Sequence, residues 1–170
     1  MRVVFVSNGV LSNLQPLLAI AVQLKRTGLT PLIVSDEQCR DICVRNGIDF
    51  LPFRPSKSQI ISDLNISEKD FAAALTSDWG FVLNKAIIPY IQQTLADLEE
   101  ALVDASILVT SSPSILARIV ADRIGVAQMA VVYQPMALTT AEMPPVFEQL
   151  PFLPVLRQRL GAWAVRPFIR

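Results

Sequence analysis

The residues RVVFVSNGVLSNLQPLLAIAVQLKRTGLTPLIVSDEQCRDICVRNGIDFLPF (2–53) alternate short, apolar, β-branched runs with longer segments of helical periodicity. The runs at 2–7, 30–35 and 48–53 predict buried strands. Between them we expect two helices, which end at Gly28 and Gly47. Short connections between alternating strands and helices predict a parallel sheet with right-handed crossovers.

The rest of the chain continues this alternation less regularly. We expect a polar irregular segment at 54–67, a capped helical segment at 67–75, and a long helix at 84–101 that is kinked at its proline. These are followed by a strand at 106–110, a helix at 114–124, a strand at 128–133 and a basic terminal helix at 157–166. The predicted fold class is α/β, a Rossmann-like parallel sheet flanked by helices, in a single domain over residues 1–170.

The composition excludes intrinsic disorder, because 52% of the 170 residues are hydrophobic and the net charge is zero. A mean hydropathy of +0.43 is high for a free domain, and we expect a partner, a membrane surface or a second copy of the chain to cover part of the surface. The charge balance argues against nucleic-acid binding. Four arginines and no acid lie in 149–170, so this segment could contact a membrane as a basic amphipathic helix or pack on its own domain.

Several kinds of chemistry are excluded by residue type. The chain has no histidine, which removes Ser–His and Cys–His catalysis. Cys39 and Cys43 cannot build a zinc site alone, and we expect two reduced, buried thiols in a cytoplasmic protein. No metal and no bound cofactor are expected. Neither a signal peptide nor a continuous apolar stretch of about 20 residues is found.

In an open parallel sheet, ligands bind beside the carboxyl ends of the strands. The candidate substrate-binding residues at these ends are Ser7, Asn8, Gly9, Ser111, Ser112, Tyr133 and Gln134. The first loop lacks the glycines of a dinucleotide-binding loop, and Gly9 suits a tight turn as well as a close ligand. The serines of the SSPS loop suit capping of the next helix as well as ligand binding. Similarly, Phe71 and its aromatic neighbours suit either an acceptor pocket or a core.

Taken together, residues 1–28, TPLIVS (30–35), GIDFLPF (47–53) and VYQPMALTTAEMPP (132–145) resemble the amino-terminal domain of GT-B glycosyltransferases of the sterol-glucosyltransferase and antibiotic-glycosyltransferase type. That family has a G-[ST]-x-G-D-[VT]-[QE]-P loop after the first strand and a GI-x-F-x-P third strand. The resemblance is weakest over 54–104, where the family varies with the acceptor.

The resemblance implies a two-domain enzyme that transfers a sugar from a nucleotide-diphosphate donor to a hydroxyl of a lipid, sterol or natural product. This domain would bind the apolar acceptor. A carboxyl-terminal domain, which this sequence lacks, or a separate chain would bind the donor.

One departure from the family's pattern concerns catalysis. Asn13 stands where the family's loop has the aspartate that removes the proton of the acceptor hydroxyl. An amide cannot take that proton at neutral pH. Asn13 suits a helix N-cap, or a hydrogen bond to the acceptor. Two further interpretations therefore stay open, a non-catalytic binding or regulatory module of the same fold and an unrelated Rossmann-like binder of a nucleotide.

Overall fold

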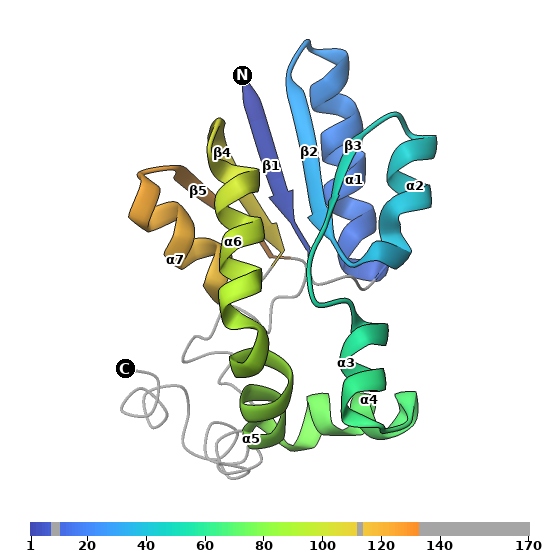
Figure 1. Ribbon diagram of the computed structural model, residues 1–170. Coiled ribbons are helices and arrows are strands. Elements are labelled where there is room, and N and C mark those ends of the chain that lie inside the picture. The colour runs from blue at the N-terminus through green and yellow to red at the C-terminus, as the bar shows by residue number, and fades with distance from the viewer. Residues whose placement is uncertain (8–10, 112–113, 133–170) are drawn as a thin grey trace, which may run out of the picture. The chain divides into compact units, whose positions relative to one another are not determined.

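The computed structural model describes residues 1–7, 11–111 and 114–132, and its centre is a sheet with the strand order β3-β2-β1-β4-β5 (Figure 1). The strands are β1 Arg2–Val6, β2 Thr30–Ser35, β3 Asp49–Pro52, β4 Ala105–Ser111 and β5 Ala127–Val131. β1 pairs in parallel with β2 and β4, and β2 pairs in parallel with β3. The predicted α/β, Rossmann-like class is confirmed.

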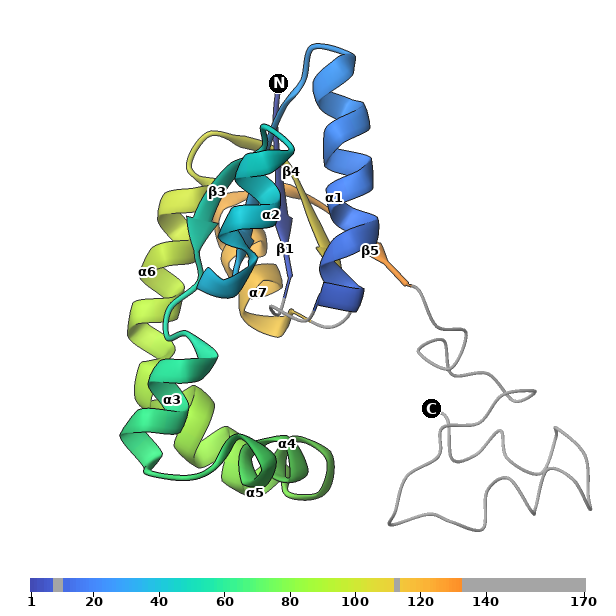
Figure 2. The same ribbon diagram turned by 90° about the vertical axis from the view of Figure 1, so that its right-hand side faces the viewer.

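Helices follow the strands along the chain. They are α1 Leu11–Arg26, η1 Glu37–Cys39, α2 Arg40–Arg45, α3 Lys57–Leu64, α4 Glu68–Ser77, α5 Trp79–Phe81, η2 Val82–Ile87, η3 Ile88–Tyr90, α6 Ile91–Leu102 and α7 Ile115–Ile124. α1 covers one face of the sheet, and α6 lies on the other (Figure 2). By its internal contacts the chain divides into two units, Met1–Ala130 and Val131–Arg170, and the description below concerns the first.

The main core lies between the sheet and the helices α6 and α7. Alternate residues of the strands, including Val4 and Val6 of β1, pack against Leu98 and Leu102 of α6 and against Val120 of α7. All five are at most 1% exposed. Full burial of such a side chain contributes about 1.5–3 kcal/mol, so this contact is a main source of stability for the fold.

α1 begins earlier than its proline predicts. Its buried residues Leu14, Leu17, Leu18 and Ala21 form one stripe at helical spacing, and burying Leu14 requires the helix to extend ahead of Pro16. Pro16 therefore lies inside the helix, where it has no N–H to donate. The interpretation of Asn13 as an N-cap is wrong, because the helix starts two residues before it.

The prediction of an irregular segment at 54–67 is also wrong, because α3 forms there. The Ser56 hydroxyl accepts a hydrogen bond from the Gln59 N–H at 3.2 Å, which caps the helix. A second apolar cluster is built by Ile60 of α3, Phe71 of α4 and Val82 and Ala86 of η2. This cluster makes α3 to η3 a small helical layer with its own core.

Most other element positions agree with the sequence within one or two residues. The expected long helix is present as η2, η3 and α6, and its winding changes around Pro89. Cys39 and Cys43 are buried, reduced thiols, as expected. The expected terminal helix, 157–166, lies outside the described residues.

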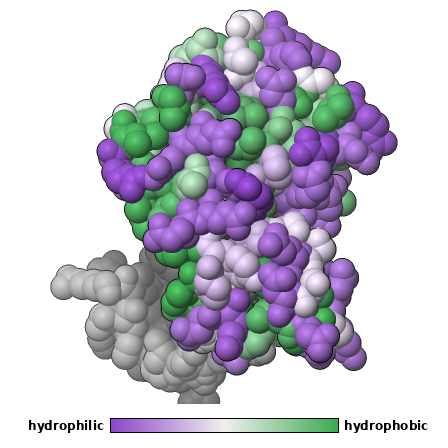
Figure 3. Space-filling model, in the orientation of Figure 1, coloured by the Kyte–Doolittle hydropathy of each residue, from purple (hydrophilic) through white to green (hydrophobic). Residues whose placement is uncertain are grey.

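The described surface is largely hydrophilic on the face that Figure 3 shows, with smaller hydrophobic groups between. Among the exposed apolar side chains, Ile115 and Ile119 are one turn apart on α7. No helix in the described part of the chain is long and apolar enough to cross a membrane.

Candidate functional site

A row of serines lies across the carboxyl end of the sheet. Val6 of β1 is in register with Val34 of β2 and with Thr110 of β4. The next residue of each strand is a serine, so Ser7, Ser35 and Ser111 follow in the same register. Residues in register on parallel strands point to the same face of the sheet. Val4 and Val6 face α6 and α7, so the three serines point to the face covered by α1 (Figure 2).

The serine row is buried and polar. Ser7, Ser35 and Ser111 are at most 2% exposed, and the hydroxyl oxygens of Ser7 and Ser111 have no hydrogen-bond partner among the described residues. Ser35 has the Cys39 thiol beside it. Burial raises the pKa of that thiol, and Ser35 partly offsets the effect. Buried polar groups normally have partners, so this row can still receive hydrogen bonds or make them.

The serine row lies at the switch point of the sheet. The chain leaves β1 towards α1 on one face and leaves β4 towards α7 on the other, and ligands of doubly wound sheets bind at such a point. Ser7 and Ser111, two of the predicted site residues, flank it. Asn8, Gly9, Ser112, Tyr133 and Gln134 lie outside the described residues.

Within the described residues, neither Ser111 nor Ser114 caps α7 with its side chain, although the sequence made both candidates for this role. Ser114 precedes α7 at its N-cap position, but its side chain makes no capping hydrogen bond. Capping by Ser111 is excluded as well, because it is the last residue of β4 and its hydroxyl has no partner among the described residues. Asn13 is half-buried in the first turn of α1.

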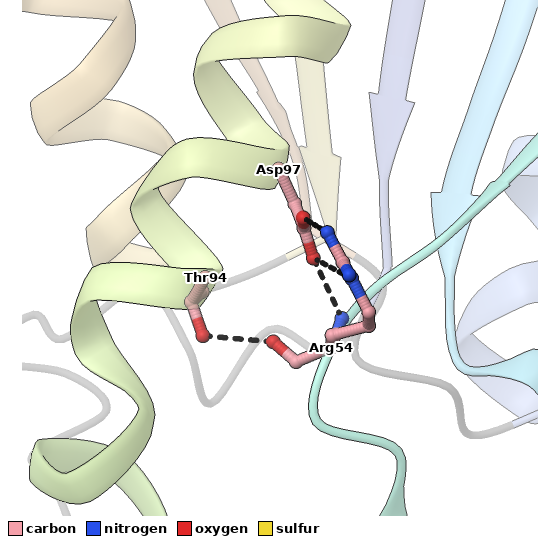
Figure 4. A network of polar contacts seen from close by, with 3 residues as sticks. All are labelled: Arg54, Thr94 and Asp97. Atoms are coloured by element: carbon pink, nitrogen blue, oxygen red, sulfur yellow. Dashed lines mark hydrogen bonds and ion pairs between the residues drawn. The ribbon is translucent and has the colours of Figure 1, made fainter.

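A polar network around the buried Asp97 carboxylate fixes the chain where it leaves β3 (Figure 4). The Asp97 carboxylate on α6 is 3% exposed and accepts hydrogen bonds from three Arg54 donors, the backbone N–H at 3.2 Å, Nε at 3.0 Å and Nη2. The Thr94 hydroxyl donates to the Arg54 carbonyl at 2.9 Å. The carboxylate in turn raises the pKa of the Arg54 guanidinium.

Beside this network lies an apolar cavity of about 330 Å³. Its walls come from the ends of β2 and β3, from the helical layer and from α6 and α7, and they include Phe53, Ile60, Phe71, Leu75, Val82 and Leu116. The polar residues among those lining it are Asp36, Lys57 and Thr94. Phe71 therefore belongs to both the second apolar cluster and the cavity wall. An apolar cavity with a few polar groups is typical of small-molecule sites.

Sequence reasoning offered Phe71 as a possible acceptor-pocket residue but did not predict the rest of this cavity. Its lining runs from Asp36 to Leu116, and no local pattern links such distant positions. One signal was present, because Asp36 directly follows the predicted strand 30–35 and Phe53 ends the predicted strand 48–53, so both had to lie at the same edge of the sheet.

A second hollow, of about 480 Å³, lies along α7 and β5. Arg118, Asp122 and Gln128 line it, and the Gln128 amide donates to the Asp122 carboxylate and to the Arg118 carbonyl. Its polar lining groups thus partly satisfy one another. No cluster of three or more potential metal ligands is found among the described residues.

Comparison with known proteins gives similarity in structure only. No family model matches the chain, and no curated protein matches its sequence. The solved structures similar to it include the spinosyn rhamnosyltransferase SpnG complexed with thymidine diphosphate, with a TM-score of 0.56 and 13% identity over 81% of this chain and 36% of that one.

Two further solved structures are similar to this chain to the same degree. The glycosyltransferase of kitacinnamycin gives a TM-score of 0.53 and 16% identity over 96% of this chain and 37% of that one. MurG of Acinetobacter baumannii gives 0.51 and 12% over 77% of this chain and 35% of that one. The chain thus spans little more than a third of the length of these neighbours, and it has the Rossmann-like α/β fold found in GT-B glycosyltransferases.

Proposed function

We propose that this chain is the acceptor-binding part of a glycosyltransferase that moves a sugar from a nucleotide-diphosphate sugar to a hydroxyl of an apolar acceptor, such as a lipid, a sterol or a natural product. The observation that carries the proposal is the apolar cavity at the carboxyl end of β2 and β3. It lies at the carboxyl edge of the sheet, the edge at which doubly wound sheets bind ligands, and its volume is at the lower end of the range for small-molecule sites.

The cavity is built for an apolar molecule. Aromatic and aliphatic side chains supply most of its walls, including Phe53, Phe71 and Leu116. An acceptor that buries its hydrocarbon body there gains about 25 cal/mol for each Å² of apolar surface removed from water. The helical layer that forms one wall has its own apolar cluster, so it can hold this shape without a ligand.

The donor would be bound elsewhere. The similar SpnG structure contains thymidine diphosphate, and this chain covers 36% of that protein. A nucleotide-diphosphate sugar would therefore sit on a further domain or on a separate chain, facing the serine row at the switch point. Ser7 and Ser111 would contact the acceptor or the sugar there, through hydroxyls that have no partner in the described structure.

Binding of 2-naphthol, a small apolar molecule with one hydroxyl, tests the proposal. We expect it to shift the amide NMR signals of residues lining the cavity, and we expect Ala86→Leu, which adds bulk inside the cavity, to weaken binding at least tenfold. Ala72→Leu on the exposed side of α4 is the matched control and should bind normally. Binding that Ala86→Leu leaves unchanged would disprove the cavity as the site.

Transfer is measured separately, as the mass gain of one sugar on 2-naphthol with thymidine- or uridine-diphosphate glucose. The protein is assayed alone and mixed with a donor-binding domain. Asn13, at the position of the family's base, favours a second candidate function, a non-catalytic module that only binds the acceptor. Binding without transfer in any mixture would support that alternative.

A further inference from the structure

The cavity contains one carboxylate among its described lining residues, that of Asp36. This residue directly follows β2 and is half-buried. The walls around it are mostly apolar, so a carboxylate there has few competing polar groups. A hydrogen bond to this carboxylate orients a ligand strongly, because bonds to charged groups are about twice as strong as neutral ones and apolar surroundings strengthen them further.

The other two polar groups of the cavity are engaged with the protein. The Thr94 hydroxyl donates to the Arg54 carbonyl at 2.9 Å, and the Lys57 Nζ lies 3.7 Å from the Glu68 carboxylate. The single hydroxyl proton of Thr94 is therefore used by the backbone, and the Lys57 ammonium, which can only donate, has the Glu68 carboxylate as a partner. Neither is as well placed as Asp36 to receive a hydrogen bond from a ligand.

Asp36 is held in a fixed position but keeps capacity for a ligand. Its Oδ1 accepts from the Gln38 N–H at 3.1 Å, and its Oδ2 accepts from the Lys57 N–H at 2.7 Å. A carboxylate offers about four acceptor sites. Two therefore stay open after these contacts, while the two backbone donors prevent the side chain from turning away.

We propose that Asp36 is the specificity-determining residue of the cavity, and that it accepts the hydrogen bond of a hydroxyl carried directly on the apolar body of the acceptor. This inference rests on the proposed function and names its substrate class, a neutral hydroxylated hydrocarbon or aromatic. The carboxylate disfavours acceptors that bring their own anion into the cavity. It also disfavours those whose oxygen has no proton to donate.

Four probes with the same ring system test the inference in the intact chain: 2-naphthol, naphthalene, 2-methoxynaphthalene and 2-naphthoate. We expect 2-naphthol to bind at least tenfold tighter than each of the others, since only its neutral hydroxyl can donate to a carboxylate. Asp36→Asn should reduce the preference for 2-naphthol over 2-methoxynaphthalene to threefold or less. Asp41→Asn, on the exposed side of α2, is the control and should keep the preference of the unaltered chain.

Asp36 also holds two backbone N–H groups, so the variant needs a check of its fold. Retained affinity for 2-methoxynaphthalene shows that the cavity of the variant is intact. Equal binding of the four probes by the unaltered chain would overturn the inference without any variant, and it would leave the proposed function standing. Failure of every probe to bind would overturn both.

Discussion

Replacing Arg54 by alanine is expected to destabilise the protein, although the Arg54 side chain is 52% exposed. The reason is its partner. Asp97 is 3% exposed, and in the variant its carboxylate loses both guanidinium contacts and keeps the backbone N–H at 3.2 Å. Leaving a buried charge without its partner typically costs about 3–5 kcal/mol.

The retained backbone hydrogen bond and the water that can enter beside the shortened side chain place the expected cost for Asp97 at the lower end, about 3 kcal/mol. Urea unfolding followed by circular dichroism measures it. With a slope of about 1.5 kcal/mol per molar urea, the midpoint should fall by about 2 M. The same change should weaken binding of 2-naphthol, because Phe53 and Pro55, on either side of Arg54, line the cavity.

Two further variants separate the charge effect from the loss of packing. Arg26→Ala removes a surface guanidinium whose contact with Gln23 is 3.4 Å long. The free energy of unfolding should change by no more than about 0.5 kcal/mol, as for ordinary surface substitutions. Adding Asp97→Asn to the Arg54→Ala chain removes the unpaired charge and should restore about 1 kcal/mol or more. If this second substitution lowers stability further, the unpaired carboxylate is not the cause and the reasoning fails.

Three other predictions concern single side chains. Burial raises the pKa of Cys43 to about 11, so its thiol should resist iodoacetamide at pH 8 until urea unfolds the chain. The thiol ionises more easily in the unfolded chain than in the folded one, so its contribution to the free energy of unfolding is fully present below about pH 9. That contribution is lost as the pH rises to about 11, by at most about 1.4 kcal/mol per pH unit. A free energy of unfolding that stays constant over this pH range would contradict the prediction. Ser111→Ala should leave the free energy of unfolding unchanged or raise it, because the hydroxyl has no partner in the described structure; a loss above about 1 kcal/mol would reveal one. Asn13→Asp puts an acid in the first turn of α1 and should stabilise the chain by about 0.5 kcal/mol, and sugar transfer in the presence of a donor-binding domain should rise about 100-fold if the residue can act as the base.

The sheet could be predicted from the sequence because its strands are continuous apolar runs. TPLIVS at 30–35 is β2 without any shift of its bounds, and Gly47 adopts a φ of +68° after α2, as expected of a helix-ending glycine. Both signals are local, since a buried strand must be apolar on both faces and a left-handed residue is most easily a glycine.

The helical layer was harder to predict because its periodicity is short. α3 has only eight residues, and its three apolar residues Ile60, Ile61 and Leu64 give only a short apolar stripe. The capping pair Ser56 and Gln59, a serine followed three residues later by glutamine, was the available signal. The start of α1 was misjudged for the opposite reason, because a proline usually marks the first turn and here burial of Leu14 outweighs it.

The serines of the candidate site could also be predicted from local signals in the sequence. Ser7 and Ser111 follow from the rule that strand ends carry the ligand, whereas the cavity depends on how α3, α4 and η2 pack against one another. Packing contacts between separate helices produce no recognisable pattern of residue spacing in the sequence.

The two polar contacts at the entrance to the helical layer indicate how such a site can change its ligand without losing its fold. Asp97 holds Arg54, and Asp36 holds the backbone of Lys57, so both ends of the segment 54–57 are tied to the sheet and α6. Beyond this segment the layer packs on its own cluster, which shares no residue with the main core between the sheet and α6 and α7. Substitutions at Phe71 or Val82 would therefore reshape the cavity while the sheet and its serine row stay in place. Under the proposed function, this separation of the part that fixes position from the part that fixes shape would let one scaffold serve different apolar acceptors.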